Sequence, residues 1–223
     1  MKFYVLVIGV CICSYLSSGC VSETGGSDGA GNSISELPIV ENFTAVPQQP
    51  WHWVRENGAA WRLAKPGLAI KLEPGGLMGA AHDANNILLH PLPEGAKRAE
   101  AAVDVTYEFQ FEQAGLILYQ DDDNYMKLVK EFVDEVEWVV LVVENSQEAQ
   151  VINKVPSPDG VVRLAYQFAH DKVTAICWGI EQEPIQVGEV NFPMTPRPQI
   201  GIFTQSGQPN AERWATFTNF KIE

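Results

Sequence analysis

The sequence predicts an all-β fold, a jelly-roll sandwich of two antiparallel sheets. From Glu41 onward it consists of short runs of β-branched and aromatic residues, interrupted by Gly, Pro, Asn or Asp about every eight to twelve residues. No long stretch shows the apolar period of an amphipathic helix. Many strands joined by short turns, without crossover helices, favour a sandwich over a parallel α/β fold.

The amino terminus predicts an export signal over residues 1–19. Lys2 precedes an apolar stretch from Phe3 to Leu16, and small residues follow it up to Cys20. Residues 16–20 read LSSGC, which is similar to a bacterial lipobox, so we expect lipidation at Cys20 and an anchor in the bacterial cell envelope. The alternative is an ordinary signal peptide cut nearby, which would give a secreted protein.

A tether and one folded domain are expected after the export signal. Residues 20–36 contain the Gly- and Ser-rich sequence SETGGSDGAGNSIS, which predicts a flexible linker. The β-sandwich is therefore expected over residues 37–223. If Cys20 carries lipid, the only other cysteine after the export signal is Cys177, which lies in an alternating apolar run and is expected to be buried.

The clearest strand pair is a hairpin from Glu112 to Phe132. Two runs with period-two alternation flank the sequence DDDN at residues 121–124, which predicts the turn. Alternation places on one, apolar face Ala114, Leu116, Leu118, Met126, Leu128 and Phe132, and on the other face a set that includes Gln113, Tyr119, Tyr125, Lys127 and Glu131.

The strands that follow the hairpin are marked by turn signals. Trp138 to Val143 is apolar at every position, which predicts a strand covered on both faces. The sequences SPDG at 157–160 and SGQP at 206–209 are typical of turns. Further strands are expected at Val161 to Phe168, Lys172 to Trp178, Ile185 to Val190, Gln199 to Thr204 and Trp214 to Ile222.

The tryptophans divide into two groups by their surroundings. Trp138, Trp178 and Trp214 lie in strongly apolar strands, so we expect them in the core. Trp51 and Trp53 share a face of the first expected strand, and they are the candidates for an exposed aromatic platform. Even for these two, core packing is the preferred interpretation.

Composition and charge exclude several classes of protein. With 46% apolar and 19% charged residues, the chain is neither disordered nor collagen-like. Lys and Arg total 15 against 28 Asp and Glu, and no basic stripe is visible, so we expect no nucleic-acid partner. The four histidines show no zinc spacing, and no phosphate loop or nucleophile elbow appears.

Four carboxylates at the end of the hairpin and just after it invite comparison with the acid pairs of glycosidases. Alternation along a continuous strand would send Glu131, Glu135 and Glu137 to one side and Asp134 to the other. A turn is expected between residues 132 and 137, however, so a solvated acidic loop is the preferred interpretation.

Several segments together resemble one family. They read WHWVRE at 51–56, WRL at 61–63, DANNILL at 83–89, QAGL at 113–116, YQDDDNYMKL at 119–128, QIGIFT at 199–204 and FTNFKI at 217–222. The chain resembles the concanavalin A-like domain at the C-terminus of family 43 glycoside hydrolases of the β-xylosidase type, and its stand-alone bacterial relatives of unknown function. The resemblance implies a curved two-sheet sandwich whose concave face can hold a glycan.

The resemblance also bears on metals. Related sandwiches often carry a calcium ion near the chain ends and commonly use an Asp of the last strand, where this chain has Asn219. Asp121, Asp122 and Asp123 lack the Gly and Glu of an EF-hand loop, so a polar turn is preferred to a calcium site. We therefore expect no cofactor and no metal.

The sequence favours a carbohydrate-binding domain that does not cleave its ligand, an oligo- or polysaccharide. Carboxylate, amide and ammonium groups can hydrogen-bond sugar hydroxyls, and aromatic rings can pack on sugar CH faces. One alternative is a glycoside hydrolase or lyase that uses acidic residues of the concave face, and another is a structural or protein-interaction module of the envelope. The candidate sugar-binding residues are Gln113, Tyr119, Tyr125, Lys127, Glu131, Trp51 and Trp53.

Overall fold

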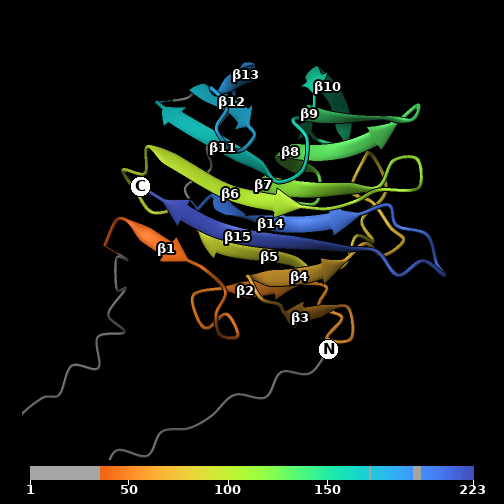
Figure 1. Ribbon diagram of the computed structural model, residues 1–223. Helices are drawn as coiled ribbons and strands as arrows, with labels where there is room; N and C mark the ends of the chain where they lie inside the picture. Colours follow the sequence, from red (N-terminus) through yellow and green to blue (C-terminus); the bar gives the residue numbers. More distant parts are fainter. Residues whose placement is uncertain (1–35, 171, 193–196) are drawn as a thin grey trace, which may run out of the picture. The chain divides into compact units, whose positions relative to one another are not determined.

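A computed structural model describes residues 36–170, 172–192 and 197–223. In this part of the chain there is no helix, and fifteen strands form two antiparallel sheets (Figure 1). The predicted all-β sandwich is thus confirmed. The predicted export signal, Cys20 and nearly all of the tether lie outside the described residues. Within the described ranges, no helix is long and apolar enough to cross a membrane.

The eight-stranded sheet lies in front in Figure 1. Its order is β13-β12-β11-β6-β15-β4-β3, and β1 pairs with β15 beside β4. Its strands are β1 (Ile39–Glu41), β3 (Trp61–Leu63), β4 (Leu68–Lys71), β6 (Arg98–Asp104), β11 (Val162–Ala169), β12 (Lys172–Trp178), β13 (Ile185–Asn191) and β15 (Trp214–Ile222).

The seven-stranded sheet has the order β10-β9-β8-β7-β14-β5-β2. The predicted hairpin forms its centre, with the turn at Asp122 and Asp123. Its strands are β2 (His52–Val54), β5 (Ile87–Pro91), β7 (Gln113–Asp121), β8 (Asn124–Val133), β9 (Val136–Asn145), β10 (Glu148–Pro156) and β14 (Gln199–Gln205).

The main core lies between the sheets because each strand points alternate side chains inward. Leu116, Leu128 and Leu141 face each other across β7, β8 and β9 and are fully buried. Cys177 belongs to this core, as predicted, and burial raises the pKa of its thiol to about 11. The inward face of β8 also carries Lys130, whose Nζ lies 2.7 Å from Glu137 Oε2.

A second apolar cluster lies on the outer face of the seven-stranded sheet. It forms because the connection from β4 to β5, residues 72–86, runs over this face; we call it the cover loop. Leu77 and Ala84 of the cover loop pack on Ile117 and Val140, and all four side chains are buried. The strand at Trp138 to Val143 is therefore covered on both faces, as predicted.

Trp51 and Trp53 do not form an exposed platform, and for Trp51 the preferred interpretation, core packing, is confirmed. Trp51 is 7% exposed and packs in the main core against Phe43 and Phe220, because the strand face it shares with Trp53 turns toward the other sheet. Trp53 is half-buried and stacks on Trp61 at 5.2 Å between ring centroids. Neither offers an open platform.

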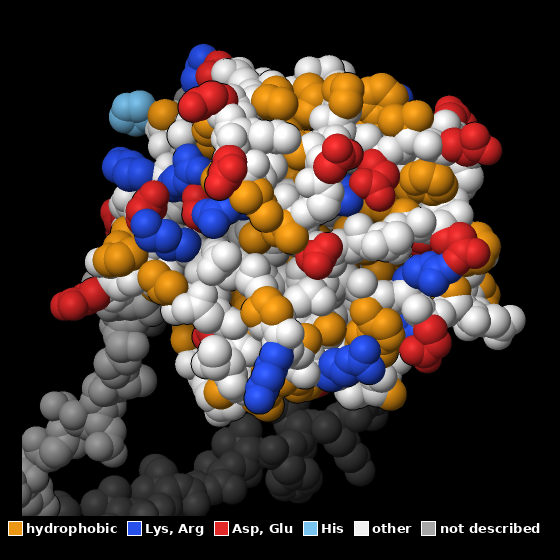
Figure 2. Space-filling view, in the orientation of Figure 1, with side chains coloured by type: hydrophobic (Ala, Val, Ile, Leu, Met, Phe, Trp, Pro, Cys, Tyr) orange, Lys and Arg blue, Asp and Glu red, His pale blue; other side chains and the backbone are white. Residues whose placement is uncertain are grey.

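The three tryptophans expected in the core are half-buried instead. Each has a cation over its ring, namely Lys154 at 4.2 Å from Trp138, Arg98 at 5.1 Å from Trp178 and Arg62 at 4.0 Å from Trp214. They point outward because the neighbouring positions in each strand fill the core. Basic and acidic side chains are interspersed on the face shown in Figure 2.

Candidate functional site

The predicted sugar-binding residues of the hairpin do share the outer face of the seven-stranded sheet. Gln113 is opposite Glu131, and Tyr119 is opposite Tyr125 in the β7–β8 register. They are less open than a binding face requires, however, because Tyr125 is 0% and Lys127 1% exposed. This outer face of the seven-stranded sheet has two parts. One, with Tyr125, lies beneath the cover loop, and the other, with Gln113, Lys127 and Glu131, lies beyond it.

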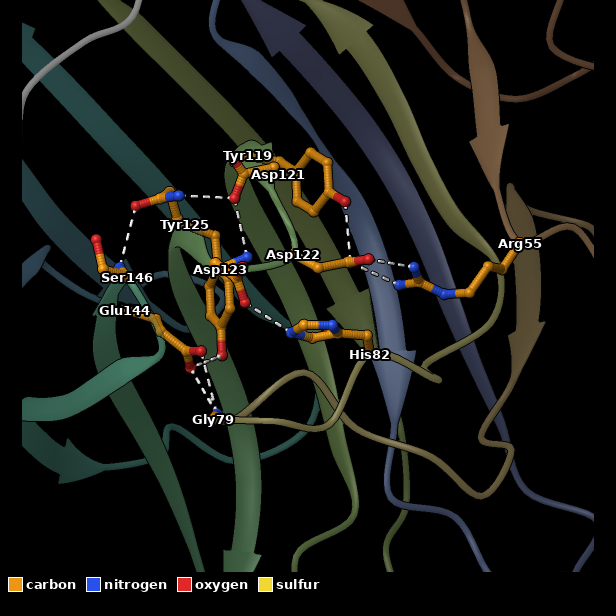
Figure 3. A network of polar contacts seen from close by, with 11 residues as sticks. Arg55, Gly79, His82, Tyr119, Asp121, Asp122, Asp123, Tyr125, Glu144 and Ser146 are labelled. Atoms are coloured by element: carbon orange, nitrogen blue, oxygen red, sulfur yellow. Dashed lines mark hydrogen bonds and ion pairs between the residues drawn. The ribbon is translucent and has the colours of Figure 1, made fainter.

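Beneath the cover loop, Tyr125 and Glu144 form a buried pair (Figure 3). The Tyr125 hydroxyl donates to Glu144 Oε2 at 2.7 Å, and the backbone N–H of Gly79 donates to both Glu144 oxygens at 3.1 Å. Burial, together with the Glu144 carboxylate, raises the pKa of Tyr125 above its ordinary value. This pair holds the cover loop down on the sheet.

The hairpin turn is held by residues far away in sequence. Arg55 donates to both carboxylate oxygens of Asp122 at 2.7 and 2.9 Å, and its Nε donates to the carbonyl of Ala84 at 2.6 Å. The Tyr119 hydroxyl donates to Asp122 Oδ1 at 2.9 Å. His82 Nε2 of the cover loop lies 2.7 Å from Asp123 Oδ1 (Figure 3).

The pKa of Asp122 reflects this arrangement. Burial by itself would raise that pKa, but the hydrogen bonds from Arg55 and Tyr119 outweigh it, so the pKa of Asp122 lies below its ordinary value. Sequence reasoning missed Arg55 and His82 as partners of the turn, because only the fold brings these two side chains to it. The Asp-rich turn is thus used for structural contacts.

Beyond the cover loop, amide groups link a buried cation to a carboxylate. Lys127 Nζ donates to Gln113 Oε1 at 3.0 Å, and Gln113 Nε2 donates to Glu131 Oε1 at 2.7 Å. Gln205 Nε2 of β14 donates to the same Gln113 oxygen at 3.1 Å. Lys127 is therefore fixed in place although no carboxylate oxygen of the described residues lies within ion-pair distance.

Burial dominates the protonation behaviour of this group. Burial lowers the pKa of Lys127 to about 8, although the negative charges of Glu131 and Glu144 act to raise it. It also raises the pKa of Glu131, a shift that Lys127 and Gln113 partly offset. Glu131 is half-buried, so one side of this polar chain reaches the surface.

Trp138 lies directly opposite Glu131 in the β8–β9 pair and shares its face. It is half-buried against the outer cluster, with the exposed Lys154 side chain over its ring. Sequence reasoning assigned Trp138 to the core because every residue from 138 to 143 is apolar. The signal for its true place is the β8–β9 register, which pairs it with Glu131.

The four carboxylates do not form a catalytic pair. Asp134 and Glu135 are the turn residues between β8 and β9, with φ of 53° and 62°. Glu131 is opposite Trp138, whereas Glu137 is opposite Phe132, so Glu131 and Glu137 lie on opposite faces of the sheet. The expectation that Glu131 and Glu137 share a side is wrong, because alternation does not continue through a two-residue turn.

Metal-binding geometry is not found in the described part of the chain. There, no three His, Cys, Asp or Glu side chains are grouped to hold an ion. Asp121 Oδ1 accepts from Asn124 Nδ2 at 2.8 Å and from the Asp123 backbone N–H at 2.9 Å. Asn219 is exposed beside the bulge of β15.

Comparison with known proteins identifies the family and the fold. Residues 76–223 match the family described as "Protein of unknown function (DUF1349)". The GH43 protein BlXynB from Bacillus licheniformis has a TM-score of 0.72 at 18% identity, with 82% of this chain and 38% of that chain covered. Xylan β-1,4-xylosidase from Bacillus halodurans C-125 has a TM-score of 0.70 at 14% identity, with 82% and 38% covered.

A functionally unknown protein from Saccharomyces cerevisiae also shares the fold, with a TM-score of 0.64 at 13% identity; 78% of this chain and 95% of that chain are covered. No curated protein sequence matches this chain significantly. The chain spans well under half the length of both Bacillus proteins. The comparisons confirm the resemblance to the concanavalin A-like jelly roll of family 43 xylosidases.

Proposed function

The chain belongs to the DUF1349 family of proteins of unknown function, and we propose that its β-sandwich is a carbohydrate-binding domain without catalytic activity. The ligand is an oligo- or polysaccharide, such as a xylan-like plant or algal glycan. The similarity to a protein named xylan β-1,4-xylosidase supports this class of ligand. Because the same fold can serve many functions, the proposal is argued from the side chains on the outer face of the seven-stranded sheet.

One observation carries the proposal: Trp138 and Glu131 are direct neighbours across β8 and β9 on the same face. An aromatic ring beside a carboxylate matches the two surfaces of a pyranose, its CH face and its hydroxyl edge. Gln113 extends the polar side through its hydrogen bond to Glu131. The exposed Lys154 side chain is flexible enough to leave the ring when a sugar packs there.

The same geometry argues for binding rather than hydrolysis. Glycosidases need two carboxylates on either side of the scissile bond. Besides Glu131, the described part of β8 and β9 presents only Glu144 on this face, and Glu144 is fully buried against Tyr125 and Gly79. Glu131 therefore has no open partner carboxylate on these two strands.

The export signal and lipid anchor belong to the same proposal, in which the domain binds glycans at the bacterial cell envelope. The sequence LSSGC at residues 16–20 supports lipidation at Cys20. Cys20→Ser should release the chain from the membrane fraction and prevent incorporation of labelled palmitate. Cys13→Ser, in the apolar stretch of the same leader, is the matched control and should leave both unchanged.

The binding experiment uses the purified full-length chain and a panel of plant and algal polysaccharides, with reducing ends assayed in the same samples. We expect binding that raises the melting temperature and releases no reducing ends. Trp138→Ala should weaken binding about tenfold or more, because it removes the stacking surface. Trp178→Ala is the matched control, since Trp178 is also half-buried beneath a cation but lies on the other sheet.

Three results would contradict the proposal. Release of reducing ends that is abolished by Glu131→Gln would make the protein a glycoside hydrolase or lyase. Absence of both binding and release across the panel would favour an envelope interaction module. Equal effects of the two Trp variants would show that the Trp138 face is not the binding surface.

A further inference from the structure

A second candidate site, a cavity, lies on the eight-stranded sheet, away from the Trp138 face. A cavity of about 620 Å³ opens between the end of β1, the turn from β3 to β4, and β15. This volume falls in the range of about 300–1,000 Å³ typical of small-molecule sites. The residues that matter for its chemistry are Asn42, Thr44, Leu63, Lys65, Thr218 and Asn219.

The backbone shapes this cavity. The β3–β4 turn closes through a hydrogen bond from the Ala64 N–H to the Gly67 carbonyl at 2.7 Å. Gly67 has a φ of +89°, and a Cβ there would lie 2.1 Å from the Phe217 carbonyl, so only glycine lets the turn pack against β15. A bulge in β15 between Thr218 and Lys221 leaves Asn219, with a φ of 52°, exposed at the rim.

The polar side chains of the cavity are free to meet a ligand. Within residues 36–170, 172–192 and 197–223, no hydrogen bond or ion pair engages the side chain of any of the five polar lining residues. Two amides, two hydroxyls and one ammonium thus converge on one space, and Leu63, which is 41% exposed, and Pro66 add an apolar surface. This combination suits a sugar, which has both hydroxyls and a CH face.

Charge narrows the class of sugar. Lys65 is the one charged residue among those described as lining the cavity, whereas the whole chain has a net charge of −13. Figure 2 shows Lys and Arg side chains at the edge of this face, over the region where Figure 1 places β3 and β4. An ammonium group as the one charged group in this lining favours a ligand that carries a carboxylate.

We propose that this cavity binds a carboxylated sugar, a uronic acid. Its carboxylate meets the Lys65 ammonium, its hydroxyls meet the amides of Asn42 and Asn219, and its CH face packs on Leu63. The proposal extends carbohydrate binding to a second site and does not require the Trp138 face to bind.

The test is calorimetric or saturation-transfer titration of the full-length chain with D-glucuronic acid and, as its neutral counterpart, D-glucose. We expect the uronic acid to bind about tenfold more tightly, since one charged hydrogen bond distinguishes the two sugars. Raising the salt concentration to about 0.5 M should reduce this preference because it screens the Lys65 charge.

Variants locate the site. Lys65→Gln should remove the preference for the uronic acid, and Asn219→Asp should abolish uronic acid binding by placing a negative charge at the rim. Lys97→Gln is the matched control, because it removes the same charge from an exposed lysine outside the cavity. Thermal unfolding of each variant checks that the fold is intact.

Equal affinity for both sugars, no binding of the uronic acid, or full preference in Lys65→Gln would overturn the proposal. So would loss of uronic acid binding in Trp138→Ala, because that result would place the ligand on the other sheet. Loss of polysaccharide binding in Trp138→Ala with uronic acid binding retained would support two separate sites. A failure of the Trp138 proposal is therefore distinguishable from a failure of this one.

Discussion

Arg55 connects two segments that are remote in sequence. Its guanidinium binds Asp122 in the hairpin turn, and its Nε binds the Ala84 carbonyl of the cover loop. Arg55→Gln should therefore lower the free energy of unfolding by about 1–3 kcal/mol, as measured by urea denaturation. Arg163→Gln is the control: this side chain is 45% exposed and 4.0 Å from Glu100, so the loss should stay within about 0.5 kcal/mol.

The pH dependence of the Arg55 effect follows from the lowered pKa of Asp122. A carboxyl group whose pKa is lowered by folding stabilises the protein above its unfolded pKa of about 3.9, and that contribution disappears as the pH falls through the folded value. The stability difference between wild type and Arg55→Gln should accordingly shrink below about pH 4. A difference that stays constant to pH 2 would show that the ion pair does not cause it.

Lys127 gives the same sign of pH dependence as Asp122, but in an alkaline range, because its folded pKa is also lowered. Burial lowers its pKa to about 8, so the unfolded chain holds this proton more tightly and the folded state is penalised at neutral pH. Lys127→Met removes the penalty. The stability of the variant relative to wild type should fall by about 2 kcal/mol between pH 7 and pH 10, the interval in which the wild-type penalty is relieved.

The Lys127 measurement needs two denaturation series, one for each protein, since other titrating groups cancel in the difference. The exposed Lys97→Met serves as the control and should show no such change. A relative stability of Lys127→Met that does not depend on pH would contradict a buried, charged lysine.

At the scale of the element, the cover loop is part of the core rather than a surface connection. Leu77 is 0% exposed within the outer cluster, whereas its neighbour Met78 is 48% exposed. Leu77→Ala should cost about 2–4 kcal/mol of stability because it leaves a cavity, and Met78→Ala should cost less than about 0.5 kcal/mol. Denaturant midpoints of the two variants compare them directly; similar midpoints would mean that the loop does not pack as described.

The hairpin was predictable and the cover loop was not, for physical reasons. Period-two alternation records which side chains share a face, so the common face of Gln113, Tyr125 and Lys127 followed from the sequence. Alternation does not indicate which other segment of the chain packs on that face, so the burial of these side chains was not predicted. Residues 72–86 read LEPGGLMGAAHDANN, which has the composition of an exposed loop, although it buries Leu77.

The sequence also failed to predict the orientation of side chains where the residue pattern does not distinguish the two faces of a strand. A strand that is apolar on both sides, such as Trp138 to Val143, does not reveal which residue meets solvent, so Trp138 was misplaced. Trp51 remained a platform candidate for the converse reason, because its polar neighbours His52 and Arg55 suggested a surface. Only the strand register and the sheet order decide these cases.

At the scale of the whole molecule, both sheets join segments from the two ends of the described chain. β15 lies between β6 on one side and β4 and β1 on the other, so the last strand depends on the first ones. Phe220 of β15 packs on Phe43 and Trp51. The family match begins at residue 76 and thus omits β1 to β4.

A fragment of residues 76–223 should consequently fail to fold, although it spans the family match. It would expose the free edge of β15 and leave Phe217 and Phe220 without the buried side chains of Phe43, Leu68 and Ile70. Circular dichroism should show no cooperative thermal transition for this fragment. A fragment of residues 36–223, which retains β1 to β4, is the matched control and should unfold in one transition like the full chain. A cooperative transition in the shorter fragment would mean that β1 to β4 are an accessory to a domain that closes without them.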